Sequence, residues 1–548
     1  MTLLSSTAIS KEDKMALWLS AAFFVFYCIY SFFSNGFYQH DEIGHYFNMR
    51  EFWNNPNVIL GNSAKTGYKL MYVIPSLLGN KFLVFFNSAL AALSCFLTFK
   101  VAHKLGSRFA WLAFFMLALQ PYWIQLSFRN YADTFSGFVL IFTLFLHFNK
   151  KYLPAALLLS FAGIIRQEFL LLLPFYGIWH ALNKRWLCFL VLGLFPILNN
   201  IWGFMATGEP LYLLTSSAKT AAKYADEWPR QGFDHYFLMS IVIWGATQCS
   251  LLILFFISSI FKKAKSFNTA GYEKEYRYQA EHKGQFIFIS LPLVMYFFIH
   301  CIFNWESVKI GAATGGNLRY MTAVSPLVAL LSAIACDRYR FFTRKNIAWI
   351  PWGGWLIFVA LFLTYTHNNV NLKTEPDSQT GELAKRDYIP LLFSLISIGI
   401  LAGVKNFRKI TLYLSVAALL FVLAAVRPFK FTPEDKTMEV ITNSLIAKKY
   451  TKNNTPIYVN HTLFKYFYDK SQRGIYNLQF YMDSLSLQTA PVGSIMVWES
   501  HYGYRPRLNK NTVNLDYFTR RPQQYILQQS RVSDDQRFQV AVFEKMAL

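Results

Sequence analysis

A short polar stretch near the start of the chain carries two adjacent carboxylates and two histidines. Asp41 and Glu42 lie between His40 and His45, directly after the first long apolar run. Ionisable side chains are costly to hold near lipid, so those found there usually serve a function. Apolar surroundings can also move the pKa of a carboxylic acid toward the range of general-base chemistry. The stretch therefore predicts a general base, with a solvated acidic turn as the alternative.

Further polar residues lie at the ends of later apolar segments. Arginine binds phosphate through two parallel hydrogen bonds, and a carboxylate can deprotonate an acceptor hydroxyl. Taken singly, each residue also fits an interfacial anchor, because arginine and tyrosine are common at membrane edges. The charges of the loops predict that these residues lie at one membrane face. Their recurrence at that face favours a functional site. The candidates are Arg129, Asp133, Arg166, Glu168, Lys309, Arg319 and Tyr320.

Composition limits the class of protein. The 548 residues are 54% hydrophobic and 15% charged, whereas about a quarter of residues are charged in a soluble protein. Several apolar runs of nearly twenty residues predict a polytopic membrane protein. The net charge of +23 does not indicate nucleic-acid binding, because the basic residues are spread through the loops between apolar runs. The six cysteines show no zinc-ligand spacing.

The apolar runs predict about 13 membrane spans, the first over 16–33. That run lacks the small-residue cleavage site of a signal peptide, so we expect it to be retained. A long polar loop, 35–69, follows and contains an amphipathic piece over 45–53. The two short spans on either side of Arg166 could instead form a re-entrant pair, which enters and leaves the membrane on the same side. The later spans are expected at 80–101, 109–127, 134–148, 153–165, 169–182, 186–205, 236–260, 286–303, 320–336, 347–366, 388–404 and 410–426.

The loop charges predict the orientation. One set of alternate turns holds 19 Lys or Arg against 4 Asp or Glu, and the other set holds 12 against 13. Excess positive charge marks cytoplasmic turns. The loop 35–69 is therefore predicted to be extracytoplasmic, and an odd number of spans places the tail 427–548 on the same side.

The chain is thus predicted to have two domains, a transmembrane domain over 1–426 and a small α/β domain over 427–548. In the tail, Thr432 followed by Pro433 predicts a helix start. Short strands are expected over 456–459, 493–498 and 538–543. The segment 498–502, which contains a histidine, is interpreted as a strand end with exposed polar residues, and a ligand contact is the alternative.

In the order of these elements the chain resembles the GT-C class of integral-membrane glycosyltransferases. This class includes protein O-mannosyltransferases, dolichol-dependent mannosyltransferases and bacterial aminoarabinose transferases. The resemblance covers roughly residues 15–340. The matching parts are the Asp41-Glu42 pair, Asp133, the run 166–168 and the segment 316–320 that leads into Pro326.

The resemblance implies a role for each residue. Asp41 would be the general base, Glu42 its supporting neighbour, and Asp133 a holder of the acceptor or of a metal ion near Asp41. His40 and His45 are candidate ligands of a divalent metal ion, and no other cofactor is expected. The residues expected to bind the lipid-linked phosphate or the rest of the substrate are Arg129, Arg166, Glu168, Lys309, Arg319 and Tyr320.

The function implied is transfer of a sugar, expected to be a hexose with inversion, from a polyprenyl-phosphate carrier. The acceptor is a hydroxyl of a glycan, lipid or protein at the outer face of the bacterial inner membrane, and no nucleic-acid partner is expected. A multi-span transporter or permease is the alternative. Because a transporter places ionisable residues near the membrane midplane in repeated broken helices, the clustering at one face favours the transferase.

Overall fold

The chain forms two compact units in the computed structural model. The first unit comprises Met1–Phe33 and Asn48–Pro428, and the second comprises Ser34–Phe47 and Phe429–Leu548. The residues that the structure describes are 10–34, 40–60, 65–216, 219, 232–260, 286–305, 317–342, 349–367, 388–426, 428, 431–447, 455–471, 479–506 and 510–546.

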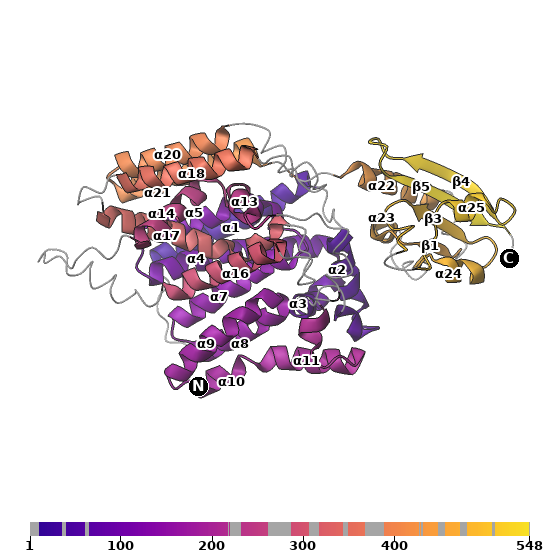
Figure 1. Cartoon of the computed structure of the whole chain (residues 1–548), viewed down its shortest axis with the longest axis horizontal. Helices are drawn as coiled ribbons and strands as arrows, with labels where there is room; N and C mark the ends of the chain where they lie inside the picture. Colours follow the sequence, from indigo (N-terminus) through magenta and orange to yellow (C-terminus); the bar gives the residue numbers. More distant parts are fainter. Residues whose placement is uncertain are drawn as a thin grey trace, which may run out of the picture. The chain divides into compact units, whose positions relative to one another are not determined.

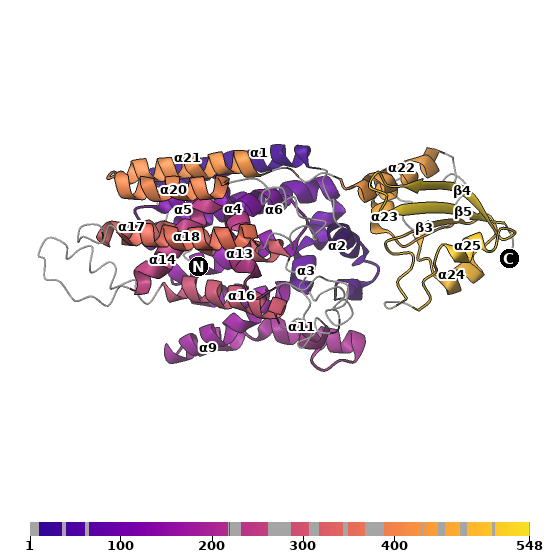
Figure 2. The same ribbon diagram turned by 45° about the horizontal axis from the view of Figure 1, so that its top comes forward.

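The first unit is helical (Figures 1 and 2), and Figure 1 shows α18, α20 and α21 side by side. Its α-helices are α1 (Lys11–Phe33), α3 (Thr66–Leu77), α4 (Asn80–Lys104), α5 (Ala110–Ala118), α6 (Pro121–Leu126), α7 (Ala132–Phe148), α8 (Tyr152–Ile165), α9 (Leu172–Leu182), α10 (Trp186–Val191), α11 (Leu194–Thr207), α13 (His235–Trp244), α14 (Ala246–Ile260), α16 (Ile287–Trp305), α17 (Ser325–Phe342), α18 (Trp349–His367), α20 (Ile389–Gly403) and α21 (Phe407–Ala425). Short 3-10 helices are η1 (Pro56–Ile59), η2 (Gln167–Leu171) and η4 (Leu318–Val324).

The described part of the chain contains five helical segments long and apolar enough to cross a membrane. Shorter apolar helices accompany them, and the chain is an α-helical polytopic membrane protein. In the segment Leu318–Tyr339, 94% of the apolar window is buried inside the unit, against 22% in Lys11–Phe33. The segment η4–α17 therefore lies in the middle of the bundle, whereas α1 leaves most of its apolar surface for lipid.

Each predicted span coincides with a helix or with two helices in sequence. The span expected over 109–127 is broken between α5 and α6, where Pro121 begins the second helix, because proline cannot donate the backbone hydrogen bond that would continue the first. The span expected over 236–260 is broken at Gly245, whose φ of 86° favours glycine. The total of about 13 spans stays a prediction.

The long polar loop predicted over 35–69 is corrected by the structure. Helix α2 covers His40–Glu51, so Asp41 and Glu42 lie in the first turn of a helix and not in an irregular loop. Helix α3 begins at Thr66 and was also not expected. Both helices carry polar residues among their apolar ones, so neither showed the long apolar run by which the other helices were recognised.

The second unit contains a five-stranded sheet in the order β2-β1-β3-β5-β4. Strand β1 is parallel to β2 and β3, and β5 is antiparallel to β3 and β4. Besides the start of α2, the elements are α22 (Pro433–Ala447), β1 (Ile457–Val459), α23 (Thr462–Ser471), β2 (Gln479–Phe480), α24 (Ser484–Thr489), β3 (Ile495–Glu499), α25 (Asp516–Thr519), β4 (Tyr525–Val532) and β5 (Gln539–Lys545).

The helix start predicted at Thr432 is confirmed. The Thr432 hydroxyl accepts the backbone N–H of Asp435 at 3.2 Å, and the Asp435 carboxylate accepts the backbone N–H of Thr432 at 2.8 Å. This reciprocal cap satisfies two donors that the first turn leaves without helical partners. The three predicted strands are confirmed as β1, β3 and β5, whereas β2 and β4 were not predicted.

Candidate functional site

Buried charges gather in the first unit where four chain segments meet. Asp133 lies in the first turn of α7, Arg166 follows the end of α8, Glu168 lies in η2 and Arg319 in η4. Asp133 is 0% exposed, and Arg166 and Arg319 are 5% and 7% exposed. With His300 of α16, these residues are called the membrane-unit cluster. The sequence predicted its four charged members as site residues, and the structure brings them together.

Arg166 is held by two carboxylates. Helix α8 ends at Ile165, and the extended backbone of Arg166 (φ −139°, ψ 124°) turns the chain away from the helix axis. One guanidinium nitrogen, Nη1, is ion-paired with Oδ1 of Asp133, and Nη2 donates to Oε1 of Glu168 at 2.8 Å. The guanidinium carbon also lies 4.6 Å from the ring centroid of Tyr320. Arg166 therefore neutralises and orients the two acids.

Arg319 is held in a different way. Its Nε lies 3.9 Å from Oδ2 of Asp133, too far for a hydrogen bond. Its guanidinium carbon lies 4.1 Å from the ring centroid of Tyr131, within the range of a cation–π contact. The side chain of Asn317 accepts the backbone N–H of Arg319 at 3.2 Å and begins η4. The stacking holds the guanidinium of Arg319 in a fixed plane beside Asp133.

His300 is a member of the cluster that sequence reasoning missed. Its side chain is 0% exposed, and Nε2 lies 3.2 Å from Oε1 of Glu168. Its ring centroid lies 4.8 Å from that of Tyr296 and 5.4 Å from that of Tyr320. A single histidine in the apolar run 286–303 was the available signal, because a buried polar group there needs a partner.

Two more buried cations lie in the same unit. Arg129 is 1% exposed, and its backbone carbonyl accepts a hydrogen bond from Asn87 at 2.9 Å. Its guanidinium carbon lies 5.8 Å from the ring centroid of Tyr131, the tyrosine on which Arg319 stacks. Lys69 of α3 is 0% exposed and was not predicted. Complete burial of a lysine is unusual and normally requires a polar partner.

The acidic pair groups with the second unit. In the first turn of α2, Asp41 is exposed whereas Glu42 is 0% exposed. Burial raises the pKa of the Tyr502 phenol, and the charge of Asp41 raises it further, so these two side chains lie near each other. Because Asp133 belongs to the first unit, the expected approach of Asp41 to Asp133 stays a prediction.

The predicted metal ligands and one substrate residue are only partly described. His45 is 1% exposed. The side chain of His40, and the whole of Lys309, lie outside the described residues. The metal site proposed there from the sequence is thus not tested.

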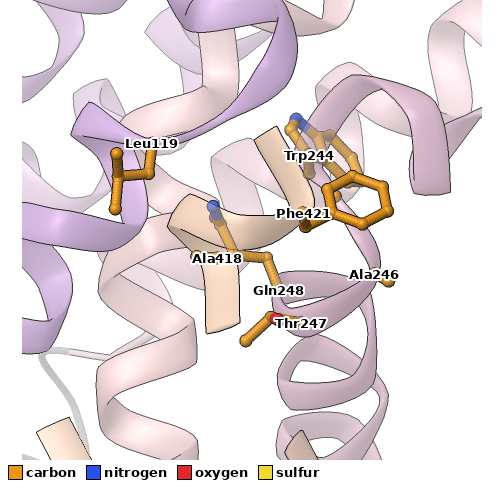
Figure 3. Close-up of a pocket in the computed structure, with 8 residues that line it drawn as sticks. Leu119, Trp244, Ala246, Thr247, Gln248, Ala418 and Phe421 are labelled. Atoms are coloured by element: carbon orange, nitrogen blue, oxygen red, sulfur yellow. The ribbon is translucent and has the colours of Figure 1, made fainter. Parts of the chain in front are cut away.

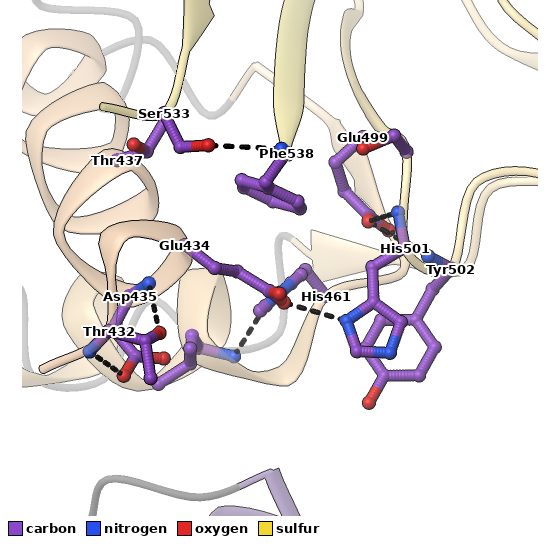
Figure 4. A network of polar contacts seen from close by, with 12 residues as sticks. Thr432, Glu434, Asp435, Thr437, His461, Glu499, His501, Tyr502, Ser533 and Phe538 are labelled. Carbon is purple, nitrogen blue, oxygen red and sulfur yellow. Dashed lines mark hydrogen bonds and ion pairs between the residues drawn. The ribbon is translucent and has the colours of Figure 1, made fainter. Parts of the chain in front are cut away.

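A group of titratable side chains in the second unit, Glu434, His461 and His501, is called the tail cluster (Figure 4). Oε1 of Glu434 lies 2.8 Å from Nε2 of His461 and 2.7 Å from Nδ1 of His501. Burial opposes ionisation of Glu434, but hydrogen bonds to both rings outweigh it and hold the pKa of its carboxyl well below the usual range. Burial raises the pKa of neighbouring Asp435 to about 6.

A small cavity in the first unit lies apart from these residues. It is lined where the end of α5, the junction of α13 with α14, and α21 meet (Figure 3). None of the predicted site residues lines it. Its lining residues are Leu119, Trp244, Gly245, Ala246, Thr247, Gln248, Ala418 and Phe421.

Comparison with solved structures identifies the fold. ArnT from Cupriavidus metallidurans bound to undecaprenyl phosphate matches with a TM-score of 0.55 and 11% identity over 96% of this chain and 97% of that chain. The same protein in the apo state matches with a TM-score of 0.51 and 11% identity over 97% and 98%. No protein-family model and no curated protein sequence matches the chain.

The structural match extends over almost the whole of both chains, so the helical unit and the tail are both accounted for. The protein has the GT-C fold, as the order of its polar segments predicted. Among solved structures its fold is similar to that of ArnT. At 11% identity the likeness concerns the fold, and the activity is argued from the site.

Proposed function

We propose that the protein is a membrane glycosyltransferase that takes a sugar from a polyprenyl-phosphate carrier. The observation that carries the proposal is the membrane-unit cluster, in which two buried arginines flank Asp133. Buried charges inside a membrane bundle are expensive and are retained for function. ArnT, which has the same fold, was solved with undecaprenyl phosphate bound. A phosphate carried on a long apolar chain suits both the charged cluster and the apolar helices that surround it.

Within the cluster we assign the carrier phosphate to Arg319 and Arg129. Arg166 already serves Asp133 and Glu168, so binding a phosphate there would compete with two carboxylates. Nε of Arg319 lies 3.9 Å from Oδ2 of Asp133. Arg319 and Arg129 both lie within cation–π range of the ring of Tyr131. Two cations on one aromatic support would stabilise the negative charge that develops on the leaving phosphate.

Asp41 is the proposed general base. Attack on the anomeric carbon requires the acceptor hydroxyl to lose its proton, and the phosphate leaves with the electrons of the broken C–O bond. An exposed carboxylate such as Asp41 can receive that proton, whereas buried Glu42 suits a supporting role. A single attack by the acceptor oxygen on the face of the sugar opposite the leaving phosphate inverts the configuration of the anomeric carbon. We propose that this reaction takes place on the extracytoplasmic side, with a hexose as the sugar.

The test uses the full chain in nanodiscs with a panel of undecaprenyl-phosphate monosaccharides and a cell-envelope extract as acceptor. The wild-type protein is expected to release undecaprenyl phosphate from at least one donor. Asp41→Asn keeps the shape of the side chain but removes its basicity, so transfer should fall about 10²–10⁴-fold. Glu42→Gln serves as the adjacent control and should cost less.

Two results would contradict the proposal. If Asp41→Asn transfers at the normal rate while Glu42→Gln does not, the two roles are exchanged. If the donor crosses a vesicle membrane without being cleaved, the protein is a transporter of a lipid-linked substrate, as the alternative interpretation of the sequence holds.

A further inference from the structure

The geometry of the tail cluster points to a zinc site formed by Glu434, His461 and His501. Oε1 of Glu434, Nε2 of His461 and Nδ1 of His501 all lie within 4.8 Å of one another. Two imidazoles and one carboxylate are a ligand set that Zn²⁺ uses when one coordination position is left open. The inference is independent of the proposed sugar transfer, because none of the three residues has a role assigned to it in that reaction.

The three ligands come from separate segments, and each is fixed by its own contacts. Glu434 lies in the first turn of α22, which the reciprocal cap of Thr432 and Asp435 orders. His461 follows Asn460, whose side chain makes two hydrogen bonds of 2.8 Å with the backbone of Met482. Such positioning by surrounding groups is what a metal site requires of its ligands.

His501 is positioned by the turn that follows β3. Buried Glu499 accepts the backbone N–H of His501 at 2.7 Å and that of Tyr502 at 2.8 Å. The His501 ring stacks on that of Tyr502, with centroids 4.2 Å apart and planes 4° apart. The segment 498–502, interpreted from the sequence as a strand end, therefore also delivers a potential ligand. Figure 4 shows Glu434 reaching from α22 toward both histidine rings.

The site is accessible on one side. The side chains of His501 and Glu434 are 33% and 24% exposed, whereas His461 is fully buried. A zinc ion with ligand bonds of about 2.0–2.2 Å holds its ligand atoms roughly 3.3–3.5 Å apart. The separations of 2.7 and 2.8 Å from Glu434 must therefore widen by about 0.6 Å. The partly exposed Glu434 and His501 are able to make this adjustment.

One hydrogen bond has to give way when the ion binds. Nδ1 of His461 accepts the backbone N–H of Leu463 at 3.2 Å, so its Nε2 carries the proton that points at Glu434. Zinc at Nε2 takes the place of that proton and leaves the proton of the neutral ring on Nδ1. The bond from Leu463 is then lost. Two buried donors, Nδ1–H of His461 and the backbone N–H of Leu463, then lack an acceptor, which costs more than one ordinary hydrogen bond but less than the affinity of structural zinc sites.

A bound ion would connect the first turn of α22 to the loops after β1 and β3. It would lie beside Tyr502, on whose phenol the charge of Asp41 acts. With three protein ligands, the fourth coordination position would hold water or an oxygen or nitrogen atom of a ligand.

The experiment measures zinc binding by the purified full chain in detergent after treatment with EDTA. Competition with a chromophoric chelator should give one Zn²⁺ per chain, and zinc should raise the unfolding temperature of the wild type. Glu434→Gln and His501→Asn should each weaken binding about 100-fold or more, because loss of an outer-shell partner alone costs 10–100-fold. Glu439→Gln, on the same helix but outside the cluster, should bind zinc normally.

His501→Asn tests whether weaker zinc binding results from the lost ligand and not from misfolding. It is suited to this because His501 is the most exposed of the three residues. In EDTA the variant should still unfold cooperatively, at a slightly lower temperature than the wild type, because it loses one hydrogen bond and one stacking contact. The X-ray absorption spectrum of the zinc-loaded wild type should show two imidazole ligands. Binding of less than one ion, or binding unchanged in both variants, would overturn the proposal and leave the tail cluster as a hydrogen-bonded triad. Neither result depends on sugar transfer, so failure here leaves the transferase proposal untouched.

Discussion

The membrane-unit cluster and the tail cluster differ in the charge of the groups that face their acids. In the first, the acids Asp133 and Glu168 are matched by Arg166 and Arg319. In the second, the single acid Glu434 faces two imidazoles, which are neutral when deprotonated. Guanidinium groups keep their charge at any physiological pH. The first cluster is therefore suited to receive an anion, and the second to receive a cation.

The surroundings reinforce this difference. Aromatic rings support the guanidinium groups of the membrane unit, as Tyr320 does for Arg166 and Tyr131 does for Arg319. Such rings stabilise a cation without neutralising it and hold the plane of the guanidinium group. In the tail, the ring of Tyr502 stacks on His501 and fixes the direction of its nitrogens. Aromatic side chains thus stabilise guanidinium groups in the membrane-unit cluster and orient an imidazole ring in the tail cluster.

The largest effect is expected from breaking the buried ion pair of the membrane unit. Asp133→Asn leaves the buried guanidinium of Arg166 with Glu168 alone and removes the nearer charge. Removing one partner of a buried pair typically costs about 3–5 kcal/mol. We expect a loss of this size in the free energy of unfolding, measured in mixed detergent micelles, together with loss of transfer.

The matched control is Asp13→Asn in the same unit. Asp13 pairs with Lys100 at 2.7 Å, but the two side chains are 19% and 25% exposed. Exposed pairs contribute about 0–1 kcal/mol, so this variant should unfold almost as the wild type does. Equal effects of the two variants would mean that the membrane-unit cluster is solvated and that its contrast with surface pairs is wrong.

A smaller effect separates the two arginines of the cluster. Arg319→Lys keeps the charge but loses the planar fork that binds phosphate. A hydrogen bond to a charged group contributes about 1.5–3 kcal/mol, so undecaprenyl phosphate should bind about 10–100-fold more weakly. Native mass spectrometry of the full chain, with undecaprenol as the uncharged control lipid, measures the phosphate-dependent part.

Arg166→Lys should behave differently. Because Arg166 joins Asp133 to Glu168, its replacement should lower stability more than it lowers affinity for the lipid phosphate. The opposite pattern, with affinity lost at Arg166 and retained at Arg319, would assign the phosphate to Arg166 instead.

The sequence predicted the elements with strong local signals. The helices of the first unit were predicted from long apolar runs, and α22 from the Thr432-Pro433 start. Strand β4 was not predicted, because its residues 528–531 are polar. They lie on an exposed edge strand, which needs no alternation of apolar and polar residues. Helix α2 was predicted only in part, as the amphipathic piece over 45–53, because the polar residues of its first turn resemble those of a loop.

The sequence predicted several of the residues that form the sites, but it did not predict which of them pair with one another. Asp133 and Arg166 were both recognised at ends of apolar runs, yet their ion pair depends on how α7 packs against α8. Glu434 directly follows the predicted helix start at Thr432 and Pro433, and no ligand role was predicted for it. Its approach to His461 and His501 is set by the sheet, which brings residues far apart in sequence together. Tertiary packing supplies such information, and no local pattern carries it.

The smallest effect tests whether helix capping places the tail cluster. Thr432→Ala removes the hydroxyl that accepts the N–H of Asp435, and loss of such a cap costs about 0.5–2 kcal/mol. The first turn of α22, which carries Glu434, should then open more often. Hydrogen exchange of the amides at 434–436 should therefore become roughly 2–30-fold faster, since about 1.4 kcal/mol is a factor of ten. Ser444→Ala, near the other end of the helix, is the control. Unchanged exchange at 434–436 in Thr432→Ala would show that the sheet contacts alone hold Glu434 against its histidines.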